Sequence, residues 1–250
     1  MFFRRLIAMS LVAWLWTVSA SAQEKGAVRE GFSAESLRGQ KILLFRPSVW
    51  VGEQSTGGMN EPNGDWTIQS RALLTEELSR RQADFSNEIV VEPELVGDDA
   101  VLVAAHKALF ASVSGSVVQY QFFKGNRLPT RKNKPFDWTL GNGTRRIAEL
   151  TGARYALLID SFDAYGSTGR KALQIMAALA RVSVSSGVHK GSAGLVDLQT
   201  GELVWLNADW QMGGDVRDEE GIRKRVGQLL EDFPGLKPVV PTVAAAQAKP

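Results

Sequence analysis

The alternation of hydrophobic and polar positions is most regular between Ala153 and Trp210. Ala153–Asp160 is apolar at both alternating sets of positions, which is typical of a strand covered on two faces. Val188–Leu198 and Glu202–Met212 are separated by a short turn that contains Gly201, the residue type that best tolerates positive φ. We therefore expect a central strand followed by a β-hairpin.

An apolar insert, residues 169–187, separates the central strand from the hairpin. Residues 171–181 are rich in strong helix formers, and residues 182–186 alternate like a strand edge. Two interpretations stay open: a core helix laid on the sheet, or a surface that contacts a lipid headgroup layer or another protein. The candidate partner surface consists of Leu173, Met176, Ala177, Ala180, Val182 and Val184.

Shorter patterns predict the remaining elements. The apolar runs 41–46 and 88–92 both precede a proline, which favours short buried strands. Helices are expected over residues 66–81, 100–113, 145–150 and 218–232, with Asp65, Asp98, Asp99 and Thr144 as N-caps and Gly152 after the third helix. Residues 51–64 are expected to form a loop. Residues 117–123 fit either a continued helix or a strand.

The N-terminus has the three parts of a secretory signal peptide. Arg4 and Arg5 are basic, Leu6–Trp16 is apolar, and Ala20–Ala22 fits a cleavage site. The apolar run is shorter than the ~20 residues of a membrane span, and no later run is expected to reach that length. An uncleaved anchor is the alternative.

These segments define the expected domain organisation. It comprises a signal peptide (1–22), a linker (23–38), a single α/β domain (39–233) with the insert at 169–187, and a disordered tail (234–250). A cleaved signal peptide places the mature protein in the periplasm.

Charge and composition exclude several classes of site. The 29 Lys and Arg residues fall to 27 once Arg4 and Arg5 are removed, equal to the 27 Asp and Glu residues. This balance argues against a nucleic-acid partner, and a basic stretch at residues 124–134 is read as a solvated connector. The chain has no Cys and 2 His, so a lipobox anchor, thiolate chemistry and a multi-histidine metal site are absent.

The candidate catalytic groups do not form a recognisable motif. The sequence 166–171 has two residues between its glycines, whereas a phosphate-binding loop has four. Asp160 and Asp163 differ by an odd number of positions, so a regular strand directs them to opposite faces. They are interpreted as strand-end or turn residues, and His106 and His189 as structural. We expect no enzymatic activity, no catalytic or metal-binding residues and no cofactor.

Four sequence segments resemble those of uncharacterised exported proteobacterial proteins. They are residues 136–141, 152–157, 165–166 and 196–205. More distantly, the order of these segments is similar to envelope domains of the curli-secretion lipoprotein type and of the Tol-propeller amino-terminal type. The resemblance implies a mixed β-sheet with helices packed on it, as in anticodon-binding-domain-like α/β sandwiches. It also implies a role in envelope assembly, secretion or regulation.

Three functional hypotheses follow. The first is a non-enzymatic periplasmic accessory protein that binds a protein partner in the envelope. The second is an oligomeric membrane-surface or pore component that uses the apolar insert for peripheral membrane contact. The third is a hydrolase that uses its Asp residues.

Overall fold

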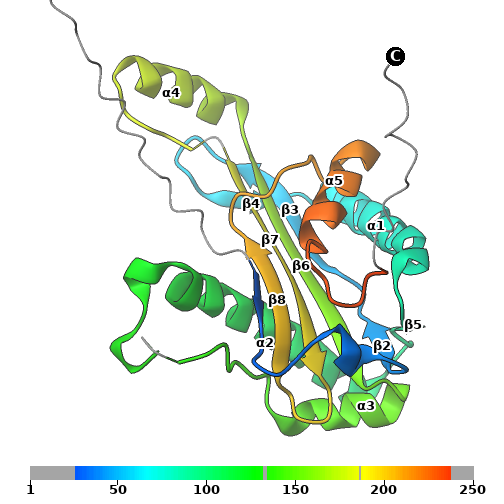
Figure 1. Cartoon of the computed structure of the whole chain (residues 1–250). Coiled ribbons are helices and arrows are strands. Elements are labelled where there is room, and N and C mark those ends of the chain that lie inside the picture. Colours follow the sequence, from blue (N-terminus) through cyan, green and yellow to red (C-terminus); the bar gives the residue numbers. More distant parts are fainter. Residues whose placement is uncertain (1–25, 132–133, 186, 238–250) are drawn as a thin grey trace, which may run out of the picture.

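The computed structural model describes residues 26–131, 134–185 and 187–237 and shows a single α/β domain built on a mixed sheet (Figure 1). The strands are β1 (Gly26–Val28), β2 (Lys41–Leu44), β3 (Ser48–Gln54), β4 (Asn60–Pro62), β5 (Glu88–Val91), β6 (Tyr155–Gly166), β7 (Gly187–Asp197) and β8 (Leu203–Asp209). The helices are α1 (Gly64–Arg81), α2 (Gly97–Val117), α3 (Arg145–Thr151), α4 (Thr168–Leu179) and α5 (Glu219–Leu229). The expected fold class is confirmed.

The long strand β6 organises the sheet. Along one edge it pairs in parallel first with β2 and then with β3, and along the other it pairs antiparallel with β7 over its whole length except the last residue. The strand order is β1-β8-β7-β6-β2-β5, with β3 and β4 beside the second half of β6. Both expected hairpin arms are therefore central strands.

Each face of the sheet carries its own hydrophobic core. Odd-numbered residues of β6, such as Leu157 and Ile159, pack with α1 and α5, whereas Ala156 and Leu158 pack with α2 and α3. This alternation follows from the two-residue period of a strand. Because helices cover both faces, the apolar pattern of β6 is nearly continuous.

The turn between β7 and β8 is held by Asp197 and requires a glycine at position 201. Asp197 Oδ1 accepts hydrogen bonds from the backbone N–H groups of Gln199 (2.8 Å) and Thr200 (3.3 Å). Gly201 has φ of 75°, and a Cβ there would overlap the carbonyl of Gly141. The turn therefore fixes the β7–β8 hairpin and also the loop at Gly141, which packs against it.

Gly201→Ala is expected to lower the free energy of unfolding by about 2 kcal/mol, because left-handed backbone strain and a steric overlap act together. Urea denaturation measures the loss. Gly227→Ala is the matched control: this helical glycine has ordinary φ and open space around its Cβ position, so alanine should be neutral or stabilising. Equal losses in the two variants would contradict the assignment.

The segment 51–64 is not the expected loop. Much of it forms β3 and β4, because β3 pairs with the distant second half of β6. Asn63, rather than Asp65, caps α1 by accepting a hydrogen bond from Trp66 N (3.0 Å). A partner more than a hundred positions away in sequence leaves no local signal, which is why this strand was missed.

The other helix boundaries differ in smaller ways. Asp98 and Asp99 lie in the first turn of α2, whose N-cap position is Val96, and Thr144 occupies the N-cap position of α3 without a side-chain capping bond. Gly152 ends α3 in the left-handed conformation, as expected. The ambiguous segment 117–123 continues α2 as a π-helical turn over Val118–Phe122.

By length and composition alone, the helix Gly97–Phe122 could cross a membrane; its mean hydropathy is 1.6 and 33% of its most apolar window is buried. This differs from the expectation that no later segment reaches that length, because the helix extends beyond residue 113 into the π-helical turn Val118–Phe122. One side of the helix packs on the sheet through Val103, Phe110 and Val117. That packing is typical of the core helix of a globular domain.

The chain ends partly join the domain. Gly26–Val28, within the expected linker, pairs antiparallel with β8, and Leu236 forms a bridge with Phe85. The expected signal peptide (1–22) and all but the first residues of the expected tail (234–250) lie outside the described residues.

Candidate functional site

Helix α4 projects from the end of the sheet, between β6 and β7, and none of its residues is buried (Figure 1). Its main ties to the domain are at its first turn, where Arg170 donates to the carbonyls of Ser185 (2.8 Å) and Thr56 (3.3 Å). The interpretation of this insert as a core helix is therefore wrong. The core on each face of β6 is formed by other helices and strands, and no residue of α4 belongs to it.

Local interactions at both ends hold α4 in shape. Ser167 Oγ accepts a hydrogen bond from Arg170 N (3.1 Å) at the N-terminus. At the C-terminus, Val182 N donates to Ala177 O (2.8 Å), with Arg181 at φ of 59°, as in a Schellman motif. A helix of this length is marginal in water by itself, so these caps matter for its stability. No strand follows over residues 182–185.

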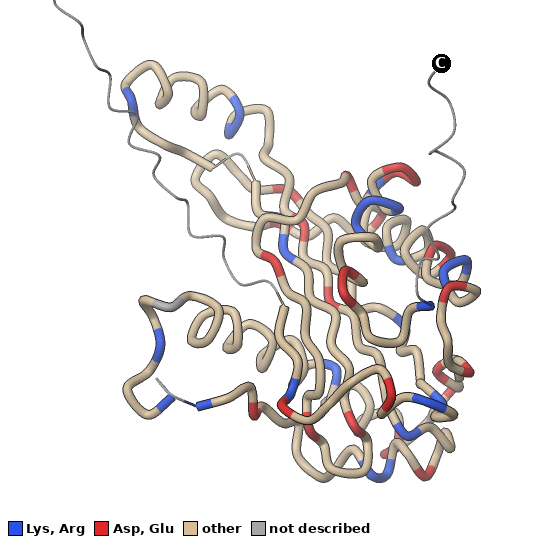
Figure 2. Tube along the Cα trace, in the orientation of Figure 1, with Lys and Arg blue, Asp and Glu red and all other residues tan. Residues whose placement is uncertain are grey.

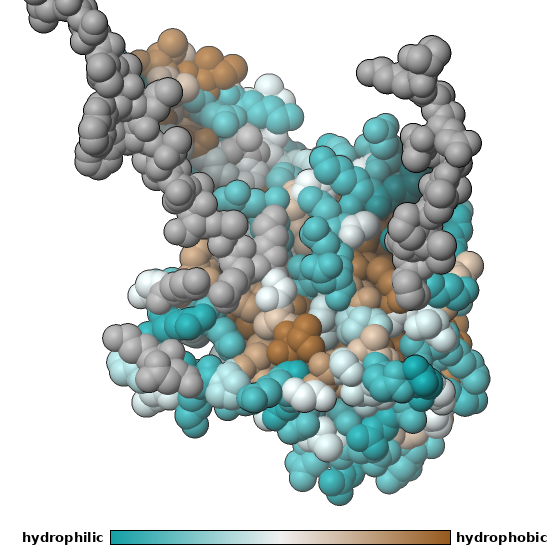
Figure 3. Space-filling view, in the orientation of Figure 1, coloured by the Kyte–Doolittle hydropathy of each residue, from teal (hydrophilic) through white to brown (hydrophobic). Residues whose placement is uncertain are grey.

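The outer side of α4 carries an apolar stripe, defined here as Ala172, Ile175, Met176 and Leu179. Ile175, Met176 and Leu179 are 66%, 64% and 77% exposed. These positions follow the i, i+3, i+4, i+7 spacing of one helix face. In Figure 3 the brown surface of this helix faces solvent at the far end of the molecule.

The structure places the predicted surface residues only partly on this stripe. Met176 lies on it, whereas Leu173 is less exposed and Ala177 and Val184 are half-buried. Ala180 and Val182 are exposed where the helix ends. Ile175 and Leu179 were missed, although a helical wheel centred on the largest aliphatic side chains would have identified them.

The segment around α4 is locally basic. Residues 167–190 contain Arg170, Lys171, Arg181 and Lys190 and no Asp or Glu. Figure 2 shows blue positions and no red ones along the projecting helix. The rest of the chain after residue 22 is net acidic, because the 27 basic and 27 acidic residues there balance only when these four cations are included.

A second candidate site is a groove of about 510 Å³ between α2 and the sheet, with a further hollow of about 320 Å³ next to it. Asp160 lines both, and burial raises the pKa of its carboxyl to about 6. Within the described ranges, no hydrogen bond or ion pair joins this carboxylate to another residue. Trp50 and Phe162 stack on the same face, with ring centroids 4.3 Å apart.

The opposite face of β6 carries a buried polar cluster around Asp163. Arg225 Nη2 and Nη1 donate to the two Asp163 carboxylate oxygens at 2.7 and 2.9 Å, and both residues are 0% exposed. Ser161 Oγ also donates to Asp163 (2.9 Å), and His189 Nδ1 lies 2.9 Å from it. Burial acts to raise the pKa of Asp163, but hydrogen bonds from His189 and Arg225 hold it below its usual range.

The cluster corrects one sequence interpretation, because Asp163 is neither a strand-end nor a turn residue. The opposite facing of Asp160 and Asp163 is confirmed. His189, interpreted from sequence as structural, contacts Asp163 in this cluster. Ser161 and Asp163 are buried beside Arg225 of α5. The cluster attaches α5 to the sheet. In the described part of the chain, no three His, Asp or Glu side chains gather as a metal site requires.

No family model and no curated protein matches the chain. Among solved structures, it is similar to the PelC dodecamer from Paraburkholderia phytofirmans, at a TM-score of 0.34 and 10% identity, over 85% of this chain and 97% of that one. Lipoprotein GNA1162 from Neisseria meningitidis has a TM-score of 0.26 and 13% identity, over 68% of this chain and 78% of that one. The LpoB C-terminal domain from Salmonella enterica has a TM-score of 0.24 and 14% identity, over 70% of this chain and 89% of that one. The resemblance is distant, and scores this low carry no functional argument.

Proposed function

We propose that the chain is a non-enzymatic accessory protein of the periplasm that acts by binding, and that α4 is its binding element. The observation that carries this proposal is the exposed apolar stripe on a helix held clear of the sheet. The signal-like N-terminus supports the compartment. The two Asp side chains most suggestive of catalysis face opposite sides of β6, which speaks against a shared reaction centre.

Docking of the stripe would contribute the free energy of apolar burial to binding. Burial of a large aliphatic or Met side chain contributes about 1.5–3 kcal/mol, and three such side chains are exposed on α4. Part of this gain offsets the entropy lost on association. The caps of α4 reduce the remaining cost, because the helix is already formed before it binds.

The test is photo-crosslinking in intact cells from a diazirine side chain placed at Ala172, on the stripe. We expect covalent adducts whose yield falls at least fivefold when Ile175 and Leu179 are both replaced by Ser. The matched control replaces Ile68 and Val101, which are similarly exposed on α1 and α2, by Ser. Absence of any adduct to protein, lipid or a second copy would contradict the proposal.

A further inference from the structure

We infer that the partner of α4 is an anionic phospholipid surface, onto which the helix docks with its stripe in the headgroup layer; this inference rests on the proposed function. The exposed apolar side chains and the surrounding cations lie on the same projecting element. A short helix with one apolar face and basic polar flanks is the form that lies in a membrane interface.

The distribution of residues around α4 fits that orientation. Gln174 lies on the side of the helix opposite the stripe, Lys171 lies at the edge of the stripe one turn before Ile175, and Arg181 follows the C-terminal end of the helix. Ile175, Met176 and Leu179 would enter the boundary between headgroups and acyl chains. The long Lys and Arg side chains can reach past the helix to phosphate groups.

The positive charge around α4 indicates that the lipid surface is anionic. Lys171 and Arg181 make no ion pair within the described residues, and no acidic side chain occurs between positions 167 and 190. Each Lys or Arg near an anionic bilayer contributes about 1 kcal/mol. Arg170 is tied to the carbonyls of Thr56 and Ser185, so it mainly orients the helix.

The same features disfavour a second copy of the chain. Pairing two α4 helices along their stripes would bring Lys171 and Arg181 of one helix near those of the other, with no carboxylate on either segment to compensate. One face of a 12-residue helix also falls well short of the ~800 Å² per partner of a standard interface. A planar lipid surface requires neither complementary charge on a partner helix nor a large protein interface.

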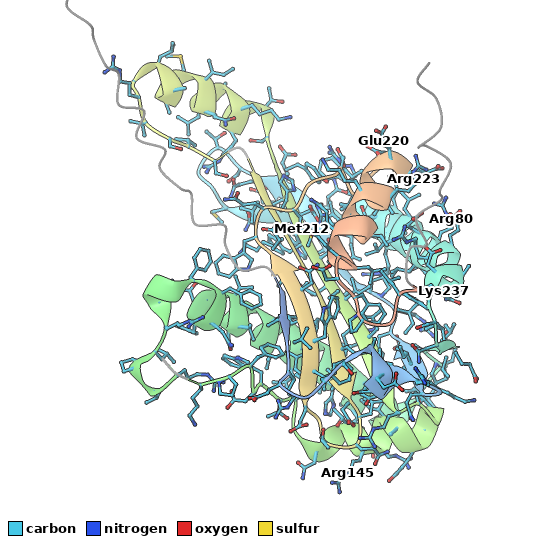
Figure 4. All side chains as sticks on the ribbon, in the orientation of Figure 1. Arg80, Arg145, Met212, Glu220, Arg223 and Lys237 are labelled. Atoms are coloured by element: carbon cyan, nitrogen blue, oxygen red, sulfur yellow. The ribbon has the colours of Figure 1, made fainter. Side chains whose placement is uncertain are left out.

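The position of α4 permits such docking. Figure 1 shows the helix at one extremity of the molecule, beyond the ends of β6 and β7. In Figure 4 this helix lies at the end of the molecule opposite the labelled Arg145. The stripe can therefore meet a flat surface without moving the sheet.

The test is vesicle flotation of the purified protein from residue 23 onward, without the apolar segment Leu6–Trp16. It is carried out with phosphatidylcholine vesicles containing 30% phosphatidylglycerol, and with pure phosphatidylcholine vesicles. We expect at least tenfold stronger partitioning to the anionic vesicles, weakened at least threefold by 0.5 M NaCl. Replacing Ile175, Met176 and Leu179 by Ser should reduce partitioning at least tenfold. Replacing Lys171 and Arg181 by Gln should remove most of the preference for anionic lipid.

Two control variants carry changes of equal chemistry elsewhere. One control replaces the exposed Ile68 and Val101 by Ser, and the other replaces the exposed Arg71 and Lys224 by Gln. Each should leave partitioning within twofold of the unaltered protein. Because α4 buries no side chain, all variants should keep the thermal midpoint within about 2 °C, since surface changes rarely exceed ±0.5 kcal/mol.

Three outcomes would overturn the inference: no flotation with either vesicle, equal loss in the control variants, or concentration-dependent self-association that disappears in the Ser variant. If flotation fails while crosslinks from Ala172 to another protein persist, the lipid inference falls and the proposed function stands. If neither vesicle binding nor any crosslink is found, both fall.

Discussion

Replacing Arg225 with Met is expected to lower the free energy of unfolding by about 3–5 kcal/mol, because it leaves the buried Asp163 carboxylate without its main counter-charge. Neither side chain is exposed, and the guanidinium also donates to the Gly213 carbonyl (3.0 Å) and to Ser161 Oγ (2.9 Å). Met has a similar length and fills much of the space. Urea denaturation at pH 7.5 measures the loss.

The double variant Asp163→Leu/Arg225→Met separates the charge effect from packing. Removing both charges relieves the desolvation penalty, so this variant should recover at least half of the stability lost in the single variant. Ser161 and His189 lose their acceptor in the double variant, which limits the recovery. If the double variant is less stable than Arg225→Met alone, the ion pair between Asp163 and Arg225 itself stabilises the fold. The loss in the single variant would then not come from leaving the Asp163 carboxylate unpaired.

Asp160→Asn is expected to raise the free energy of unfolding by about 2–3 kcal/mol at pH 7.5, since each unit of pKa shift corresponds to about 1.4 kcal/mol. Burial raises the pKa of this carboxyl from 3.8 in an unstructured peptide to about 6, with no partner for the charge in the described part of the chain. The neutral amide has a similar shape and avoids the cost of a desolvated charge.

The pH dependence gives the sign of this effect. Between about pH 4 and 6 the folded state binds more protons at Asp160 than the unfolded state, so stability falls as the pH rises through that window. The gain from Asp160→Asn should therefore be roughly a third as large at pH 4.5 as at pH 7.5, where it is complete. Asp98→Asn, on the exposed first turn of α2, is the control and should change stability by a few tenths of a kcal/mol at most. A gain that is independent of pH would rule out the charge as its cause.

The elements predicted well from sequence are those whose determinants are local. The β7–β8 turn, the strand β6 and the helix α5 all follow from patterns within a few residues. Gly152 was placed correctly for the same reason, because only its own backbone conformation decides it.

The elements missed depend on distant parts of the chain. β3 is a strand because of β6, and Asp163 is an ion-pair partner because α5 returns Arg225 to it. The exposed residues of α4 were only partly predicted for a related reason. The exposure of a helical side chain depends on whether other elements cover it, and residue spacing alone does not specify this. The insert was nevertheless identified as the segment too apolar for a surface connection.

The placement of α4 between β6 and β7 also affects the order of folding. The entropic cost of closing a loop grows by about 0.6 kcal/mol per doubling of its length, so closing β6 onto β7 across residues 167–186 costs about 2 kcal/mol more than a two-residue turn would. The tight β7–β8 hairpin should form earlier, and β6 should add to it through side-chain contacts such as those around Leu157 and Leu195. Because α4 contributes nothing to this assembly, its sequence is free to change with its partner while the fold stays the same.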